Sequence, residues 1–179
     1  MANKPRPVTI KSFKDSHGKI DFEMLEGTQK TDTLVFNKTK DNMKKNESYD
    51  IQFTLVNTDG LQLQFKQDMQ DVMWVAKGSK TSPPGCPNNK VSDPEFTVTG
   101  VTATTLDVTN TDKDECKFKF VLNFIDTGNH NKAEQFDPIY DNQNGGFSRA
   151  FAISNTVIIG GVAAVGALLV AMCAMDRIG

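Results

Sequence analysis

Residues that could carry out catalysis are few and widely separated in this chain of 179 residues. Its two histidines, His17 and His130, both lie in polar, turn-forming segments. A catalytic triad or a metal site needs such rings beside other functional side chains, and the flanking residues supply no pattern of that kind. Motifs for a serine nucleophile, a phosphate-binding glycine loop and a His-Glu-x-x-His zinc site are missing as well. We therefore predict surface histidines, no cofactor, no metal and no enzymatic activity.

The three cysteines, Cys86, Cys116 and Cys173, are far apart in the sequence. Cys86 and Cys116 could form a disulfide in an oxidising compartment. No apolar signal peptide follows the N-terminal residues, which favours thiols over a disulfide. Neither cysteine has the close Cys or His spacing of a zinc site.

Two groups of acidic and amide side chains resemble parts of cation sites. One consists of Asp137, Asp141 and Asn144. It departs from the EF-hand loop because the expected central glycine arrives one position early, so turn and strand-end positions are the favoured interpretation. The other consists of Asp112, Asp114 and Glu115. It could bind a cation at the rim of a sandwich, but a solvated turn is favoured.

The segment 37–46 is rich in lysine and could be a basic patch. However, no aromatic side chains interleave these lysines, as stacking on bases would require. The formal net charge of −2 gives no overall field that attracts nucleic acid. We therefore predict a solvated loop and no nucleic-acid partner.

The hydrophobic pattern of the body has a period of two, which is typical of strands. Apolar and polar residues alternate over 51–55 and again over 61–65, on either side of the turn Asn57-Thr58-Asp59-Gly60. This arrangement predicts a β-hairpin in an antiparallel, half-covered sheet. The same order of strand, Asn-Thr-Asp turn and strand recurs around Asn110. Other predicted strands cover residues 8–13, 33–36, 71–76, 96–99, 105–109, 116–124 and 137–140.

These short strands, separated by regular turns, predict an all-β, antiparallel two-sheet sandwich of the Ig-like kind, followed by a single C-terminal transmembrane α-helix. Residues 20–22 form either a further short strand or part of a helical turn, and residues 126–135 a polar loop. The chain has 12 Phe but 1 Trp and 2 Tyr, so we expect a core built mainly on phenylalanine. The predicted parts are an N-terminal arm at 1–7, the β-sandwich at 8–146, a linker at 147–152, the helix at 153–175 and a tail at 176–179.

Residues 77–93 form a long predicted loop, because prolines and glycines within it oppose regular structure. A loop of this length in a compact domain is often functional. Its centre, which we call the partner loop, consists of Pro83, Pro84, Gly85, Cys86 and Pro87. We predict that these residues, together with exposed sheet edges, contact a protein partner.

The segment Val157–Met175 contains neither a charged residue nor a proline. A helix needs about 20 apolar residues to cross a bilayer, and the mildly polar residues before Val157 complete that length. Since this is the single long apolar segment and it stands last, we predict a single-pass, C-terminal membrane anchor. The β domain is then expected on the cytoplasmic side, with membrane lipid around the anchor.

Small residues recur along this predicted helix, often four positions apart, and give it a smooth face that another helix can approach closely. The candidate helix-packing residues are Gly160, Gly161, Ala163, Ala164, Gly166, Ala167 and Ala171. We predict that this face packs against other transmembrane subunits or against a second copy of the chain. A plain anchor that faces lipid is the alternative.

A set of residues in the second part of the body is distinctive. It comprises Trp74, Cys86-Pro87, Leu106-x-Val108-x-Asn110, the strand Lys117 to Phe124, Asp137-Pro138-Ile139, Asn142 and Gly145-Gly146. With these residues, the region from Trp74 to Gly146 resembles a group of small, uncharacterised bacterial β-sandwich proteins. The resemblance covers under half of the chain, implies a β-sandwich and carries no activity. The transmembrane tail departs from that group.

The sequence thus predicts a non-enzymatic, tail-anchored accessory or scaffolding subunit of a membrane protein complex. Its helix would pack through the Gly/Ala face, and its β-sandwich would cap or recruit a partner. One alternative is a self-assembling envelope or virion structural protein. Another is a β-sandwich module that binds a small ligand or an ion with the loops at one end.

Overall fold

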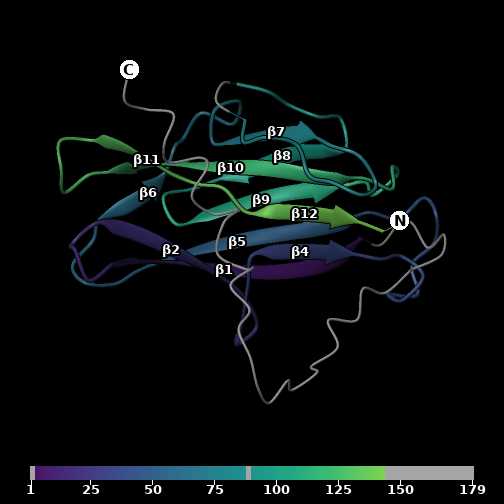
Figure 1. Cartoon of the computed structure of the whole chain (residues 1–179), viewed down its shortest axis with the longest axis horizontal. Coiled ribbons are helices and arrows are strands. Elements are labelled where there is room, and N and C mark those ends of the chain that lie inside the picture. Colours follow the sequence, from purple (N-terminus) through teal and green to yellow (C-terminus); the bar gives the residue numbers. More distant parts are fainter. Residues whose placement is uncertain (1–2, 88–89, 144–179) are drawn as a thin grey trace, which may run out of the picture. The chain divides into compact units, whose positions relative to one another are not determined.

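The computed structural model describes residues 3–87 and 90–143, and within these residues the fold is all-β (Figure 1). Residues 20–22, for which the sequence allowed either a short strand or part of a helical turn, form a strand. The strands are β1 (Lys4–Lys14), β2 (Ile20–Glu26), β3 (Gln29–Thr31), β4 (Thr33–Phe36), β5 (Tyr49–Asn57), β6 (Leu63–Phe65), β7 (Met73–Lys77), β8 (Phe96–Val101), β9 (Thr105–Asn110), β10 (Lys117–Asp126), β11 (Lys132–Phe136) and β12 (Ile139–Asn142).

The strands form two mixed sheets that make a β-sandwich. The first sheet has the order β3-β2-β1-β5-β9-β8, and the second has the order β11-β10-β12-β4, with β6 and β7 also paired to β10. Two pairs are parallel, β1 with β5 and β12 with β4. The all-β prediction is confirmed, but the prediction of purely antiparallel sheets was wrong. A period of two identifies the buried face of a strand and not the direction of its neighbour.

Strand β1 begins at Lys4, so residues 4–7 belong to the sandwich and not to a separate arm. In this first part β1 has a neighbour on one side only, because β5 pairs with Lys4–Ser12 whereas β2 pairs from Thr9 onward. A proline cannot donate to a sheet ladder and is therefore tolerated where one side of the strand is open. Pro5 and Pro7 lie in this part, which explains how they fit within a strand.

The segments on either side of Gly60 do not form the predicted hairpin. β5 pairs with β1 and β9 in the first sheet, whereas β6 pairs with β10 in the second. The turn after Asn57 therefore carries the chain from one sheet to the other. Alternation could not distinguish these cases, because the same face of a strand is buried whether the next strand lies beside it or opposite it.

Strand β11 occupies part of the predicted polar loop 126–135, which is a second correction. Its five residues are exposed or half-buried, so they lack the hydrophobic alternation by which a strand is recognised. Pairing with β10, from Leu122 to Asp126, holds β11 in the sheet. The strand therefore depends on its neighbour and not on a pattern of its own.

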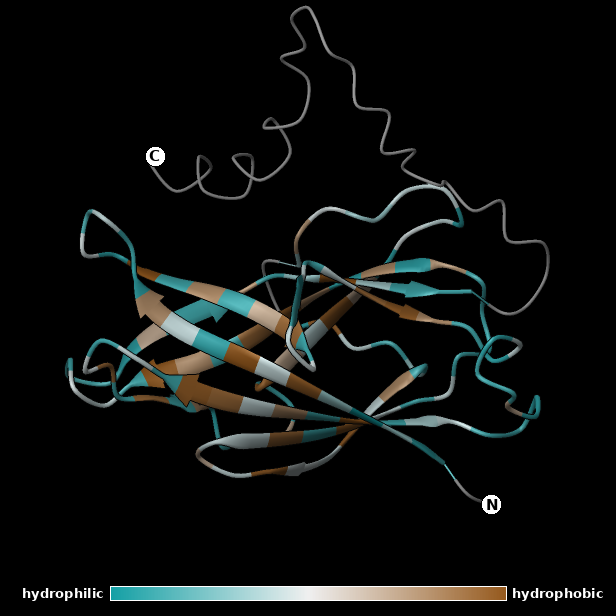
Figure 2. Ribbon diagram, turned by 90° about the horizontal axis from the view of Figure 1, so that it is seen from below, coloured by the Kyte–Doolittle hydropathy of each residue, from teal (hydrophilic) through white to brown (hydrophobic). Residues whose placement is uncertain are grey.

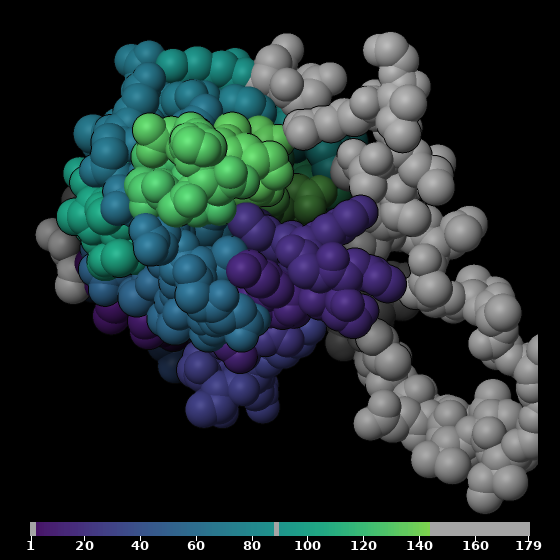
Figure 3. All heavy atoms as spheres, turned by 90° about the vertical axis from the view of Figure 1, so that its left-hand side faces the viewer, coloured from purple at the N-terminus to yellow at the C-terminus, as the bar shows by residue number. Residues whose placement is uncertain are grey.

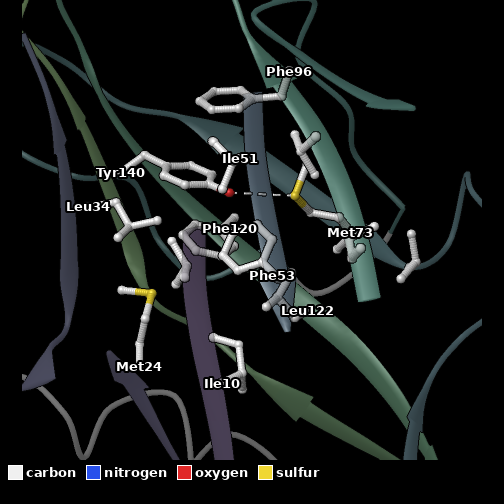
Figure 4. Packing of buried hydrophobic residues seen from close by; sticks show 14 of the residues in the cluster. Ile10, Met24, Leu34, Ile51, Phe53, Met73, Phe96, Phe120, Leu122 and Tyr140 are labelled. Carbon is white, nitrogen blue, oxygen red and sulfur yellow. Dashed lines mark hydrogen bonds between the residues drawn. The ribbon is translucent and has the colours of Figure 1, made fainter. Parts of the chain in front are cut away.

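The inner faces of the two sheets share one core that is rich in phenylalanine, as the composition predicted. Hydrophobic and hydrophilic residues alternate along the strands in Figure 2. Tyr140 stacks on Phe96 and Phe120, with ring centroids 4.6 Å and 3.8 Å away. Its hydroxyl donates to the sulfur of Met73 at 3.8 Å (Figure 4). The fully buried phenylalanines include Phe36, Phe53, Phe65, Phe118, Phe120 and Phe124.

Candidate functional site

Two segments that the sequence assigns to solvated loops meet at one end of the sandwich. The β4–β5 loop places Lys38 inside, with 7% of its surface exposed, and the turn after β9 places Asp112 inside, with 1% exposed. The predictions of a solvated lysine loop and a solvated acidic turn were therefore wrong at these two residues. Together with Glu95, Asn110 and Asn142, which are also buried, they form what we call the buried polar cluster.

The amino group of Lys38 joins the two loops. Its Nζ donates hydrogen bonds to the carbonyl oxygens of Thr111 at 2.7 Å and of Lys45 at 3.1 Å. Burial lowers the pKa of Lys38, while the carboxyl groups of Asp112 and Glu95 act in the opposite direction. The amino group thus binds the backbone of both loops and holds them together.

Within the part of the chain that the structure describes, the backbone of Asp112 is hydrogen-bonded, whereas its carboxyl group is not. Its N–H donates to Asn110 Oδ1 at 2.9 Å, and its φ of 44° lies in the left-handed region, which aspartate tolerates better than most residues. Neither carboxyl oxygen has a hydrogen-bond partner among the described residues. Burial raises the pKa of the Asp112 carboxyl to about 7; Lys38 acts to lower it, and Glu95 and Asp41 raise it further. The group therefore retains its proton up to nearly neutral pH.

Glu95 contributes a second buried carboxyl group from the segment before β8. Its Oε2 accepts hydrogen bonds from Thr111 Oγ1 and the N–H of Lys113, both at 2.8 Å. Its Oε1 accepts a third from the N–H of Asp114 at 3.0 Å. Buried polar groups are ordinarily satisfied in this way. Glu95 therefore follows the usual rule, whereas Asp112 departs from it.

Asn110 and Asn142 connect the ends of β9 and β12. Asn110 Nδ2 donates to Asn142 Oδ1 at 2.9 Å, and Asn142 Nδ2 donates to Asn110 Oδ1 at 3.3 Å. Because Asn110 Oδ1 also accepts from Asp112, this amide links the turn to β12. The buried polar cluster thus reaches the last strand of the sandwich.

A network of charged groups fastens the start of β1 to the same β4–β5 loop. The Tyr49 hydroxyl donates to Asp41 Oδ2 at 2.8 Å, and Lys4 Nζ lies 2.7 Å from Asp41 Oδ1. Arg6 Nε lies 2.5 Å from Glu26 Oε1 on β2. The pKa of Tyr49 is raised, mainly by burial and to a smaller extent by the hydrogen bond to Asp41. Through Asp41, the loop that supplies Lys38 is therefore also held against Tyr49 of β5 and Lys4 of β1.

The partner loop is exposed at its centre, and the chain around it is held in place. The N–H of Gly78 donates to the carbonyl of Lys117 at 2.8 Å, and the N–H of Val75 donates to that of Val91 at 2.8 Å. A Cβ atom on Gly78 would lie 2.5 Å from the carbonyl oxygen of Ser82, so this tight turn requires glycine. Pro83 and Gly85 are exposed, Pro84 and Cys86 half-buried, and Pro87 buried. A protein partner for this loop stays a prediction.

The structure shows the exposure of the two histidines and the state of Cys116. His17 and His130 are both exposed, which confirms the prediction of surface histidines. Cys116 is a free cysteine, so the disulfide with Cys86 that the sequence left open is not formed.

The remaining acidic candidates pair with neighbouring side chains. Lys119 Nζ lies 3.3 Å from Asp137 Oδ2, and Gln143 Nε2 donates to Asp141 Oδ2 at 3.1 Å. Asp114 forms an ion pair with Lys77, and Glu115 Oε2 lies 2.7 Å from Lys80 Nζ. Asn144, the last member of the calcium-like fragment, falls outside the described residues. Among the residues that the structure describes, no group of three or more His, Cys, Asp or Glu could hold a metal ion.

The candidate helix-packing residues, from Gly160 to Ala171, also lie outside the described residues, as does the whole predicted span at 153–175. No helix of membrane-crossing length and hydropathy occurs among residues 3–87 and 90–143. The anchor and its packing face therefore stay predictions.

The Asn57 end of the sandwich carries an open cleft of about 630 Å³ between three loops. Figure 3 views this end, where the purple β1–β2 segment, the blue β5–β6 segment and the light-green β10–β11 segment come together. Its rim includes Lys14, Lys19, Lys132, Asp126 and Glu134. Because the rim carries both signs of charge, it selects neither an anion nor a cation by charge alone.

No protein-family model matches this chain, and a search of curated proteins found no match. The resemblance of residues 74–146 to small bacterial β-sandwich proteins stays a prediction.

Sequence patterns missed the buried polar cluster because its members come from distant segments. Lys38 and Thr111, which are hydrogen-bonded, are 73 positions apart. One signal was present: the turn Asn57-Thr58-Asp59 recurs as Asn110-Thr111-Asp112. That repetition marks a special turn, but nothing local indicates which of the two aspartates is buried.

Proposed function

We propose that this protein is a non-enzymatic, tail-anchored accessory or scaffolding subunit of a membrane protein complex. The observation that carries the proposal is the uncharged, proline-free run Val157–Met175. With the residues before it, this run is long enough to cross the bilayer as a helix, which needs about 20 apolar residues.

In this proposal the predicted helix and the β-sandwich have separate roles. The helix packs through its small residues against other transmembrane subunits, and the β-sandwich binds a partner on the cytoplasmic side. The partner loop suits this second task because Pro83 and Gly85 are exposed and the chain on both sides is hydrogen-bonded to β7 and β10. Proline also restricts the unbound loop, so less conformational entropy is lost on binding.

A single arginine tests the anchor. Leu168→Arg places a charge near the middle of the run, which costs roughly 2.5–3.5 kcal/mol of insertion free energy. We expect the full-length wild-type chain to remain in the membrane pellet after alkaline carbonate extraction and Leu168→Arg to be largely released. The matched control is Val56→Arg on β5, where the valine is 44% exposed and an arginine is harmless. Release of the wild-type chain would refute the anchor.

A second pair of variants tests the packing face. Ala164→Leu enlarges a residue on the small face, whereas Val162→Leu enlarges one on the opposite side of the helix, because two residues turn it by about 200°. After extraction in mild detergent, we expect the wild type and Val162→Leu to co-purify with other membrane subunits and Ala164→Leu to lose them. Regular rings or lattices of identical copies would instead favour the self-assembling structural protein. A lone wild-type monomer would refute both.

Protease treatment of intact cells tests the orientation of the domain. A cytoplasmic β-sandwich is protected in intact cells and becomes accessible to protease after the cells are broken. Digestion in intact cells would place the domain on the other side and would leave the anchor itself unaffected.

A further inference from the structure

The Asp112 carboxyl group occupies a position that suits an uncharged acid. It is 1% exposed, and neither of its oxygens has a hydrogen-bond partner among the described residues. A buried carboxylate that lacks donors is strongly disfavoured, whereas the protonated group carries no net charge to desolvate. Most of the donors nearby are directed elsewhere: Lys38 Nζ gives two of its three N–H groups to backbone carbonyls, and the N–H groups of Lys113 and Asp114 bind Glu95.

The charged and titratable groups that face Asp112 come from every segment packed around it. Lys38 and Asp41 belong to the β4–β5 loop, Tyr49 begins β5, and Glu95 precedes β8. Lys38 is the positive charge among those that act on Asp112, and Glu95 and Asp41 are negative. Because Lys4 pairs with Asp41, ionisation of Asp112 adds to Glu95 a second negative charge in the buried polar cluster, against the positive charge of Lys38.

We propose that Asp112 is a proton-controlled latch, which keeps the buried polar cluster closed while its carboxyl group is protonated and favours opening once the group ionises. Opening would let the carboxylate reach water by moving the turn 110–116 away from Lys38 and Glu95. This inference is independent of the proposed membrane function, since it rests on contacts within the sandwich.

Opening of the latch has a defined consequence for the rest of the domain. Glu95 lies just beyond the long loop that contains the partner loop, and three hydrogen bonds tie it to the turn after β9. Lys38 fastens the β4–β5 loop to the same turn through Thr111. Separation of this turn therefore frees one end of the long loop and the β4–β5 loop together. A change of proton concentration would thus alter the surface that contains the partner loop.

The direction of the pH dependence follows from the raised pKa of Asp112. In the open form the carboxyl group titrates near the ordinary value of about 4, and in the closed form near 7. The closed form therefore binds the proton more tightly, and its advantage is lost as the pH rises through 7. Between pH 5 and 7 the open fraction should rise about tenfold per pH unit and should then level off.

Hydrogen exchange of the full-length protein in a mild detergent tests the latch at pH 5, 6, 7 and 8. After correction for intrinsic exchange rates, we expect protection in segments 37–48 and 111–116 to fall about tenfold per pH unit up to pH 7. Asp112→Asn keeps a neutral side chain of the same shape and tolerates the left-handed backbone, so its protection should not depend on pH. Asp59→Asn is the matched control, because Asp59 has the same place in the other turn but is exposed. It should behave as the wild type.

Carbon-13 NMR of the Asp112 carboxyl group gives a second readout that needs no variant. A titration midpoint near 7 supports the latch, and a midpoint near the ordinary value of about 4 overturns it. Equal pH dependence in Asp112→Asn and the wild type would overturn it as well. So would an intact mass lower by one water that is restored in Asp112→Ala, because Asp112 would then be linked to Lys38 as an amide and could not titrate.

Discussion

Two turns of the same sequence, Asn57-Thr58-Asp59 and Asn110-Thr111-Asp112, carry the chain from the first sheet to the second. They lie at opposite ends of β5, because Asn110 pairs with Tyr49 at its start and Asn57 is its last residue. Their backbones are alike: the threonine N–H donates to a carbonyl at 3.0 Å in the first turn and 2.9 Å in the second. The aspartates have φ angles of 53° and 44°.

The surroundings of the two turns differ in burial and charge. Asp59 is exposed, and its carboxylate accepts a hydrogen bond from the N–H of Lys14 at 2.9 Å. Asp112 is buried and has no such donor among the described residues, while Lys38 and Glu95 are buried beside it. The comparison teaches that a short sequence can specify a turn, whereas the segments packed over the turn decide whether its carboxyl group is charged.

The largest effect is expected from the loss of the Lys38 amino group. Lys38→Met leaves two part-buried carbonyl oxygens, those of Thr111 and Lys45, without their donor, which costs roughly 2–5 kcal/mol of unfolding free energy. Urea unfolding of the full-length protein in a mild detergent, followed by the fluorescence of Trp74, measures the change. Lys40→Met is the control, because Lys40 is an exposed lysine of the same loop. Equal stabilities of the two variants would show that the cluster contributes nothing special.

The two asparagines provide a direct comparison of the turns. Asn110 is fully buried and bonds to Asn142 and Asp112, so Asn110→Ala should cost roughly 2–3 kcal/mol. Asn57 is half-buried and bonds to Ser12 and Leu63, where water can replace part of the loss, so Asn57→Ala should cost about 1–2 kcal/mol. The same urea titration measures both. A larger loss in Asn57→Ala would reverse our ranking of the two ends.

The threonines give a smaller and sharper difference. Thr111 Oγ1 donates to the Glu95 carboxyl group at 2.8 Å, whereas Thr58 Oγ1 donates to the carbonyl of Ser12 at 2.7 Å. Hydrogen bonds to charged groups are stronger, so Thr111→Val should cost about 1.5–3 kcal/mol and Thr58→Val about 1 kcal/mol. Thermal unfolding at pH 8 compares the two variants. Equal melting temperatures would indicate that Glu95 adds nothing to this bond.

The smallest effect is expected where the turns cease to be equivalent. Gly60 follows the first turn with a φ of 71°, and the corresponding residue of the second turn is Lys113. Gly60→Ala meets no steric obstacle but places a side chain in the left-handed region, which costs about 1 kcal/mol. Urea unfolding measures the loss. An unchanged midpoint would mean that this turn adopts a different backbone when it is substituted.

Much of the fold could be predicted from the sequence because strands have a local signature. The alternation over 51–55 and 105–109 identified β5 and β9, and the abundance of phenylalanine identified the material of the core. The partners of these strands could not be predicted, because a strand buries the same face in a parallel, antiparallel or opposed arrangement. Strand β11 escaped prediction for the related reason that its position depends on β10.

The sequence by itself determined that the body is built of strands, that two turns share an Asn-Thr-Asp backbone and that the histidines lie at the surface. These properties follow from residue type and nearest neighbours. Only the tertiary structure decided that Lys38 and Asp112 are buried together, because the free energy of a charge depends on how much water the surrounding segments exclude. Those segments, the β4–β5 loop and the residues before β8, come from distant parts of the chain.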